Sequence, residues 1–278
     1  MNKRKIEDLL SRCPGLEPVL EEMLEVSGYV WEKGWAERNA GNLSIDATEH
    51  IPPGMFPESS DRLRKLDFTY PALAGRYFLV TGSGKRFRDM AKAPAANACI
   101  LRISDDGAGY RIIWGGEDAP DFRPTSEFPA HLRLHEHMRQ TNAQEKVVLH
   151  THPVELIALT HLPEYRDEPA LNQALWSTHP EVKYNLPKGV GFVPYVIPGS
   201  EKLAQATLEC FRRGYSVVLW EIHGSVSRAK EPMVAFDLID IANKAASIVL
   251  MCRSAGHTPT GLTKEQLDEI ARTFKLEE

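Results

Sequence analysis

A turn-forming link between two short apolar segments limits what this chain can fold into. Residues 98–103 and 110–114 read as strands, and the link between them, SDDGAG, is typical of a β-hairpin. A hairpin pairs its strands antiparallel, so the sheet cannot be of the purely parallel, doubly wound kind. Because further strand-like segments mix with helical ones, we predict an α/β fold, a single three-layer α/β/α domain with a mainly antiparallel central sheet.

The remaining elements follow from apolar periodicity. We expect helices at about 16–35, 125–140, 153–160, 201–213, 232–254 and 264–274, strands at 76–81, 146–149 and 216–220, and an extended segment at 182–198. Residues 46–75, rich in Pro, Asp and Ser, are expected to form a surface excursion, and residues 1–15 an N-terminal extension. One domain would then cover residues 1–278.

Charge and composition exclude several classes of partner. The 33 Lys and Arg residues against 38 Asp and Glu give a net charge of −5, with no long block of like charge, which argues against nucleic acid. The apolar stretches are far shorter than the roughly 18 residues that span a bilayer, and no apolar run follows the basic N-terminus. The four cysteines form neither a disulfide pattern nor a CxxC metal clip. We therefore predict a soluble, cytoplasmic protein with reduced, mostly buried thiols and no membrane partner.

Histidines follow two of the most apolar strands. His150 and His152 stand two residues apart at the end of strand 146–149, so their side chains share one face. His223 follows strand 216–220 directly and precedes Gly224. Three imidazoles from two strand ends match a zinc site that keeps a fourth position open. The alternative is a group of histidines at the edge of the core whose rings bond the backbone.

A second histidine pair offers a competing metal site. His131 and His135 lie four residues apart on the expected helix at 125–140, a spacing that also allows chelation. The metalloprotease form of this motif needs a glutamate after its first histidine, but residue 132 is a leucine. A solvated or capping role is expected for this pair, and structural roles are expected for His50, His137, His161, His179 and His257.

Three turn-like segments each allow two interpretations. Residues 124–127 (PTSE) read as a helix N-cap, or as an anion site in which Glu127 is a general base. Residues 82–85 (GSGK) read as a glycine turn or as an amide nest for phosphate, without the spacing of a nucleotide P-loop. Residues 38–42 (RNAGN) by themselves predict only a turn.

Taken together and in this order, the segments resemble a known family. Residues 34–43, 80–85, 124–131, 150–152 and 220–224 are similar to the zinc-dependent class II sugar-phosphate aldolases, and the likeness extends from about residue 20 to 275. The resemblance implies one Zn²⁺ per subunit on His150, His152 and His223, with Glu127 as the catalytic acid/base. It also implies a homotetramer and a phosphate site formed by Asn39, Asn42, Ser83, Gly84, Thr125 and Ser126.

Two positions depart from the family pattern. The resemblance gives Glu181 the place of a second acidic residue that reaches into a neighbouring subunit's site, but here Pro180 precedes it and the flanking residues differ. Ala40 stands where the family has a glycine, which matters only if this position needs a positive φ.

The resemblance implies reversible cleavage of L-rhamnulose 1-phosphate to glycerone phosphate and L-lactaldehyde, with zinc as the Lewis acid. Two related enzymes, L-fuculose-1-phosphate aldolase and L-ribulose-5-phosphate 4-epimerase, share the histidine pattern but are not expected to carry the excursion at 46–75. An adducin-like scaffold without activity is the other alternative, and it predicts loss of the metal ligands. All three histidines are present in this chain.

Overall fold

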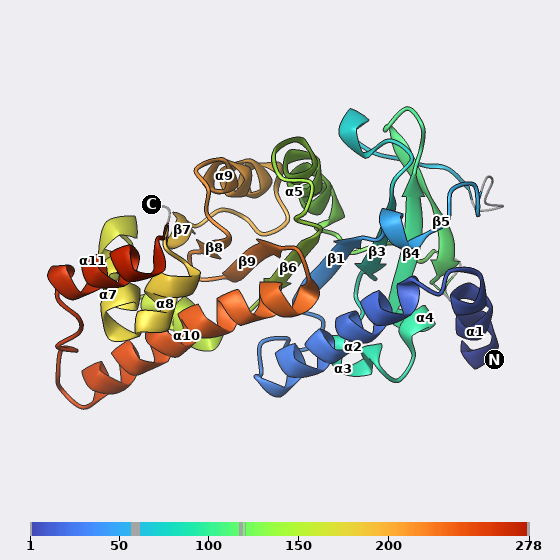
Figure 1. Cartoon of the computed structure of the whole chain (residues 1–278). Helices are drawn as coiled ribbons and strands as arrows, with labels where there is room; N and C mark the ends of the chain where they lie inside the picture. The colour runs from blue at the N-terminus through green and yellow to red at the C-terminus, as the bar shows by residue number, and fades with distance from the viewer. Residues whose placement is uncertain (1, 57–61, 117–118, 120, 277–278) are drawn as a thin grey trace. The chain divides into compact units, whose positions relative to one another are not determined.

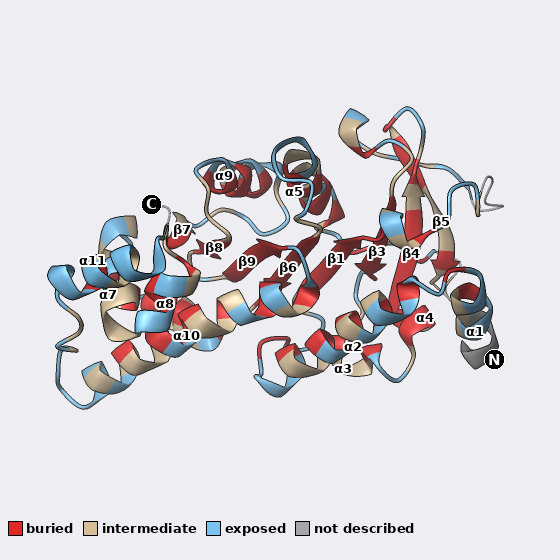
Figure 2. Cartoon of the chain, viewed as in Figure 1, coloured by how far each residue is buried: buried red, intermediate tan, exposed pale blue. Residues whose placement is uncertain are grey.

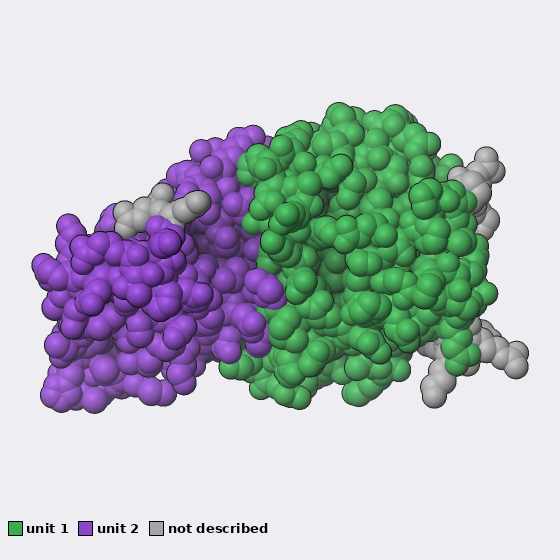
Figure 3. Space-filling view, in the orientation of Figure 1, with its two compact units in different colours: residues 1–149, 229–233 green, residues 150–228, 234–278 purple. Residues whose placement is uncertain are grey.

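A computed structural model describes residues 2–56, 62–116, 119 and 121–276 (Figure 1). The chain divides into two compact units, residues 1–149 with 229–233, and residues 150–228 with 234–278 (Figure 3). The chain passes from one unit to the other three times. The single domain expected over residues 1–278 stays a prediction.

The first unit contains an antiparallel sheet whose strand order differs from the order of the strands in the sequence. Its strands follow one another in the order β2-β5-β4-β3-β1-β6, and β4 and β5 form the predicted hairpin, with a bulge between Ile100 and Leu101. The elements are α1 (Asn2–Arg12), α2 (Leu16–Glu32), β1 (Asn42–Asp46), β2 (Arg64–Lys65), β3 (Tyr77–Thr81), α3 (Phe87–Met90), α4 (Pro94–Asn97), β4 (Ala98–Ile103), β5 (Gly109–Gly115), α5 (Phe128–Thr141) and β6 (Val147–Thr151). All strand pairs described in this unit are antiparallel, as predicted.

Burial explains why these segments take these positions (Figure 2). Every residue of β1 and β3 is buried, so both faces of the sheet are covered, as a three-layer arrangement requires. Helix α2 buries Leu16, Leu20 and Met23, which recur at three- and four-residue steps along one face. Its predicted amphipathic pattern is therefore confirmed.

The second unit combines parallel and antiparallel pairing. Its strand order is β6-β9-β8-β7, where β8 pairs antiparallel with β9 and parallel with β7. Its elements are α6 (Val154–Leu159), α7 (Glu168–Thr178), α8 (Pro180–Asn185), β7 (Val190–Val193), α9 (Glu201–Arg212), β8 (Val217–Trp220), β9 (Gly224–Ala229), α10 (Pro232–Ser254) and α11 (Lys264–Phe274). Asn243 of α10 accepts a hydrogen bond from the amide of Leu156 (3.0 Å) and donates one to Glu155 (2.7 Å), which holds the start of α6.

Three segments differ from the expectation. Residues 182–185, which were expected to be extended, belong to helix α8; Val182 and Leu186, four residues apart, are both buried. Helix α7 was not predicted; it begins where the side chain of Asp167 caps the amide of Ala170 (3.1 Å). The N-terminal extension contains helix α1.

The segment 46–75 is more than a surface loop. Its described part includes the edge strand β2, which pairs with β5, and the core residues Tyr70 and Leu73. The hydroxyl of Tyr70 donates to the carbonyl of Pro129 (3.2 Å) at the start of α5. All four cysteines are free, and three of them are buried, as predicted. No described helix is both long and apolar enough to cross a bilayer.

Candidate metal centre

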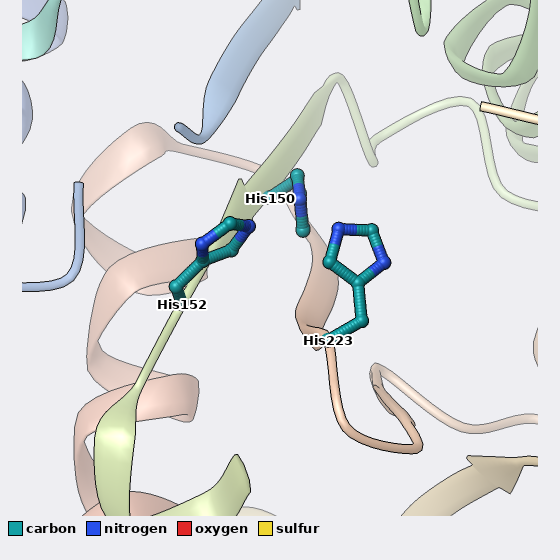
Figure 4. A group of neighbouring side chains, drawn as sticks. All are labelled: His150, His152 and His223. Carbon is teal, nitrogen blue, oxygen red and sulfur yellow. The ribbon is translucent and has the colours of Figure 1, made fainter. Parts of the chain in front are cut away.

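The three histidines predicted as metal ligands meet in the second unit. His150 lies in β6, His152 follows the end of that strand, and His223 lies in the turn between β8 and β9. One ring nitrogen from each lies within 4.8 Å of the others, and the rings face a common space (Figure 4). His150 is buried, whereas His152 and His223 are half-buried, so the group can be reached from solvent. Within the described residues, this is the histidine group that could hold a metal ion.

The surroundings of His150 set its tautomer and charge. Its Nδ1 lies 2.9 Å from the carbonyl oxygen of Ser225, which can only accept, so Nδ1 carries the proton and Nε2 keeps its lone pair. Burial lowers the pKa of His150 to about 3, and the charge of nearby His152 acts in the same direction. The ring is therefore a neutral imidazole near pH 7, the form that binds a metal.

A tryptophan next to the site was not predicted from the sequence. The ring of Trp220, the last residue of β8, lies 4.6 Å from the ring of His150 and 5.0 Å from that of His223. The indole Nε1 of Trp220 donates a hydrogen bond to the hydroxyl of Thr207, which is buried (2.9 Å). This bond fixes the indole, so Trp220 limits where both histidine rings can turn. The aromatic end of the segment SVVLW was the sequence signal for it.

The turn that carries His223 is strained. Ile222 has φ +61°, in the left-handed region that a β-branched residue rarely adopts. Such a conformation costs about 1–3 kcal/mol and persists only where its surroundings enforce it. Because Ile222 directly precedes His223, its backbone conformation determines the direction in which the imidazole of His223 points.

Gly224 follows His223 and leaves no room for a side chain. A Cβ at this position would lie 2.5 Å from the carbonyl oxygen of Thr151 and 2.9 Å from Cδ2 of His152. We expect Gly224→Ala to push β9 and β6 apart and to weaken zinc binding by at least about tenfold, because misplaced ligands lose affinity. Zinc affinity measured by competition with a chromogenic chelator tests this expectation.

Gly28→Ala is the matched control for that variant. Gly28 lies inside helix α2, and a Cβ there would meet nothing within 4 Å. This variant should keep zinc affinity and raise the free energy of unfolding by about 0.5–1 kcal/mol, as alanine does in helices. An unchanged zinc affinity in Gly224→Ala would show that the close approach of β9 does not matter to the site.

The competing pair, His131 and His135, is structural in a way that the sequence did not suggest. Both are buried, and each has a ring nitrogen 2.7 Å from the single hydroxyl of Ser44 in β1. The predicted solvated or capping role is therefore wrong. The i, i+4 spacing places both rings on the inner face of α5, where they bond the neighbouring strand.

The burial of His135 predicts a pH-dependent stability. Desolvation, aided by the charge of Arg76, lowers the pKa of His135 to about 3. Between pH 6.5 and 3 the unfolded chain binds a proton that the folded chain does not, so the free energy of unfolding falls as the pH falls through this window. At pH 5 the loss from this residue is about 2 kcal/mol.

Urea unfolding of the metal-free protein at pH 7.5 and pH 5 measures this loss. His135→Gln should reduce the difference between the two pH values, whereas His257→Gln, at an exposed position, should not. Equal pH dependence in the wild-type protein and His135→Gln would rule out the assignment.

The predicted phosphate residues gather in the first unit. Ser83 donates its amide to the carbonyl of Arg123 (2.9 Å), and Thr125 donates its amide to the carbonyl of Thr81 (2.8 Å). These bonds bring the turn at 82–85 beside the segment 124–127. Asn42 lies at the start of β1, next to Leu43, whose amide donates to the hydroxyl of Thr81 (3.1 Å). Asn39 lies in the exposed turn before it.

Glu127 belongs to the same group. Its Oε2 accepts a hydrogen bond from Nδ2 of Asn42 (2.9 Å). The helix α5 begins at Phe128 with Glu127 as its N-cap, and no side chain caps it. The helix predicted to begin near residues 125–127 thus begins at Phe128, directly after that segment, and the amide of Phe128 donates to the carbonyl of Thr125 (3.0 Å).

Two further positions can be placed. Glu181 is exposed in the first turn of α8 in the second unit. Ala40 has no positive φ; Arg38 (φ +53°) and Gly41 (φ +76°) make the sharp turn instead. Alanine at position 40 is therefore tolerated without strain.

A cavity with a volume of about 550 Å³ lies elsewhere in the first unit. Several of its charged groups already have partners: Glu49 pairs with Lys146, and Asp46 pairs with Arg76. None of the predicted site residues lines it.

The chain is similar over most of its length to known aldolases. Residues 21–250 match the family described as "Class II Aldolase and Adducin N-terminal domain". The rhamnulose-1-phosphate aldolase of Bacteroides thetaiotaomicron is 39% identical over 272 residues, which cover 98% of this chain and 99% of that protein. The rhamnulose-1-phosphate aldolase of Klebsiella pneumoniae is 36% identical and covers 93% of both chains.

Solved structures give the same result. The sugar-phosphate aldolase from Thermotoga maritima superposes with a TM-score of 0.75 at 33% identity, over 88% of this chain and 99% of that one. An L-fuculose 1-phosphate aldolase has a TM-score of 0.60 at 20% identity, over 94% and 97% of the two chains, which shows a shared fold. The chain belongs to the class II aldolase and adducin family.

Proposed function

We propose that this protein is a zinc-dependent lyase that reversibly cleaves L-rhamnulose 1-phosphate to glycerone phosphate and L-lactaldehyde. The observation that carries the proposal is the convergence of three imidazoles, one of them held neutral, in a chain whose relatives over almost its full length are rhamnulose-1-phosphate aldolases. Class II aldolases depend on a metal ion.

The donor set suits a divalent transition metal. Imidazole nitrogens are common ligands of zinc, and neutral ones leave the ion its full charge. The absence of a side chain at Gly224 lets β9 approach His150 and His152 closely, since a Cβ there would lie 3.1 Å from Cε1 of His150 and 2.9 Å from Cδ2 of His152. A bound ion would act as a Lewis acid on the negative charge that develops beside the substrate carbonyl.

Side chains of the protein would transfer the proton and orient the groups that take part in cleavage. In cleavage between C3 and C4, the C4 hydroxyl loses a proton as it becomes the aldehyde carbonyl, and C3, the carbon that keeps the electron pair, gains one. We assign the delivery of the proton to C3 to Glu127. Asn42 would orient the carboxylate through its 2.9 Å hydrogen bond. Glu181 would contribute to the site of a neighbouring subunit in a homotetramer, as the family resemblance implies.

The phosphate would be bound by Asn39, Asn42, Ser83, Gly84, Thr125 and Ser126. Two observations support this phosphate site. Backbone hydrogen bonds hold the turn at 82–85 beside the segment 124–127, and Ser83, Gly84 and Ser126 are exposed. Amide and hydroxyl groups in such turns bind anions without a large positive charge. The net charge of −5 is therefore compatible with a phosphorylated substrate.

A substrate panel tests the proposal. The purified protein is loaded with zinc and assayed with L-rhamnulose 1-phosphate, L-fuculose 1-phosphate and L-ribulose 5-phosphate. We expect the highest kcat/KM for L-rhamnulose 1-phosphate, with equal amounts of glycerone phosphate and L-lactaldehyde formed. Preferred cleavage of the fuculose substrate, or epimerisation of ribulose 5-phosphate, would replace the proposed specificity with that of a relative. A cytoplasmic location stays a prediction of the sequence.

A further inference from the structure

The turn Glu221–Ile222–His223 is bound to its surroundings at each of its backbone amides. Glu221 donates to the carbonyl of Val193 (3.0 Å), and His223 donates to the carbonyl of Trp220 (3.1 Å). The amide of Ile222 donates to a side chain, the hydroxyl of Thr160 (2.9 Å). We propose that Thr160 is a positioning residue, which holds Ile222 in its left-handed conformation and thereby sets His223 for metal binding. This inference rests on the proposed function, because it takes His223 to be a metal ligand.

Thr160 can accept this hydrogen bond because its side chain is completely buried and its hydroxyl proton already takes part in another hydrogen bond. The hydroxyl donates to the carbonyl of Ile157 (2.7 Å), so its lone pairs are left to accept from Ile222. Thr160 also ends helix α6, which begins directly after the segment that carries His152. One hydroxyl therefore connects the helix that follows His152 to the turn that contains His223.

A second set of contacts holds the same turn from its exposed side. Nε of Arg166 lies 3.0 Å from the carbonyl oxygen of Thr160 and 3.0 Å from Oε1 of Glu221. The other carboxylate oxygen of Glu221 accepts from the amide of Tyr195 (2.7 Å). Arg166 thus ties the backbone of Thr160 to the residue before Ile222.

The strain at Ile222 explains why these contacts are needed. A β-branched residue at φ +61° is driven back toward negative φ by the clash of its Cβ with the backbone. The side chain is 44% exposed, so packing does little to hold it. Without the hydrogen bond to Thr160, the peptide plane between Glu221 and Ile222 would rotate about φ of Ile222, and the imidazole of His223 would move away from the other two rings.

Zinc affinity, measured by chelator competition on the full chain, tests the inference. Thr160→Val keeps the shape of the side chain but removes the hydroxyl, and we expect a roughly ten- to hundredfold loss of affinity, as for other groups that orient metal ligands. Thr160→Ser should restore wild-type affinity. The matched control is Thr178→Val, since Thr178 also donates to a helix carbonyl (Ala174, 2.7 Å) but no backbone amide bonded to its hydroxyl is described.

A double-mutant cycle isolates the strain. Glycine adopts φ +61° without cost, so in the Ile222→Gly background the loss caused by Thr160→Val should be clearly smaller. An equal loss in both backgrounds would contradict the role of strain. If Thr160→Val does not fold, Arg166→Met, at a half-exposed position, should weaken zinc binding in the same direction, and wild-type affinity in that variant would overturn the inference.

The absorption spectrum of the cobalt-loaded protein gives a readout that does not depend on activity. Thr160→Val should change the visible bands of bound Co²⁺, because the third imidazole is displaced, whereas Thr178→Val should not. If the wild-type protein binds neither Zn²⁺ nor Co²⁺, the proposed metal centre itself is wrong. If the wild-type protein binds the metal and Thr160→Val binds it equally well with the same spectrum, the positioning role alone is wrong.

Discussion

Glu127→Ala should bind as much zinc as the wild-type protein and lose at least about a hundredfold in kcat for aldol cleavage. The carboxylate is the proposed proton carrier, and alanine removes it without touching any of the three histidines. Its Oε2 accepts from Nδ2 of Asn42 in a half-buried position, so the structure already orients it. Metal content and steady-state kinetics on the same sample separate the two effects.

Two further variants make this test specific. Glu127→Gln keeps the size of the side chain but cannot exchange a proton, so it should lose a similar share of the rate. Glu136→Ala removes a carboxylate of the same helix, one that accepts from the amide of Ala72 (3.3 Å), and should retain wild-type kcat. Near-normal turnover of zinc-loaded Glu127→Ala would end the assignment of Glu127 as the acid/base.

His223→Ala should lose stoichiometric zinc, and its cleavage rate should fall to that of the chelated wild-type protein. Two ligands would remain on β6 and the segment after it, too few for the three protein ligands of a catalytic zinc site. The loss should appear in metal analysis after dialysis and in the assay alike.

His161→Ala serves as the control for the ligand variant. His161 is an exposed histidine of the same unit that follows helix α6, and its replacement should leave metal content and rate unchanged. If His223→Ala kept one zinc per chain and its activity, the metal would have to be held by other residues.

The grouping of the three histidines could be predicted because its signal is local. Apolar strands deliver His150, His152 and His223 at their ends, and both the spacing and the strand assignments are readable in the sequence. The hairpin at 98–114 was predictable for the same reason, since its turn residues lie between two β-rich runs. The substrate came from the family resemblance and could not be deduced from the residues alone.

The tertiary contacts around the histidine groups could not be predicted. Thr160 and Ile222 are 62 residues apart, and neither periodicity nor spacing indicates that a hydroxyl at one meets an amide at the other. The shared hydroxyl of Ser44 likewise turned a possible metal pair, His131 and His135, into a buried structural one. Tertiary hydrogen bonds of this kind decide the role of a polar side chain after the local structure is set.

The central claim is metal-dependent cleavage of a ketose 1-phosphate, and one assay tests it most directly. The protein is freed of metal with a chelator, dialysed, and assayed with L-rhamnulose 1-phosphate before and after addition of one equivalent of Zn²⁺. We predict that glycerone phosphate and L-lactaldehyde appear in equal amounts only in the reconstituted sample. Equal rates with and without the metal, or no glycerone phosphate from the zinc-loaded protein, would contradict the account.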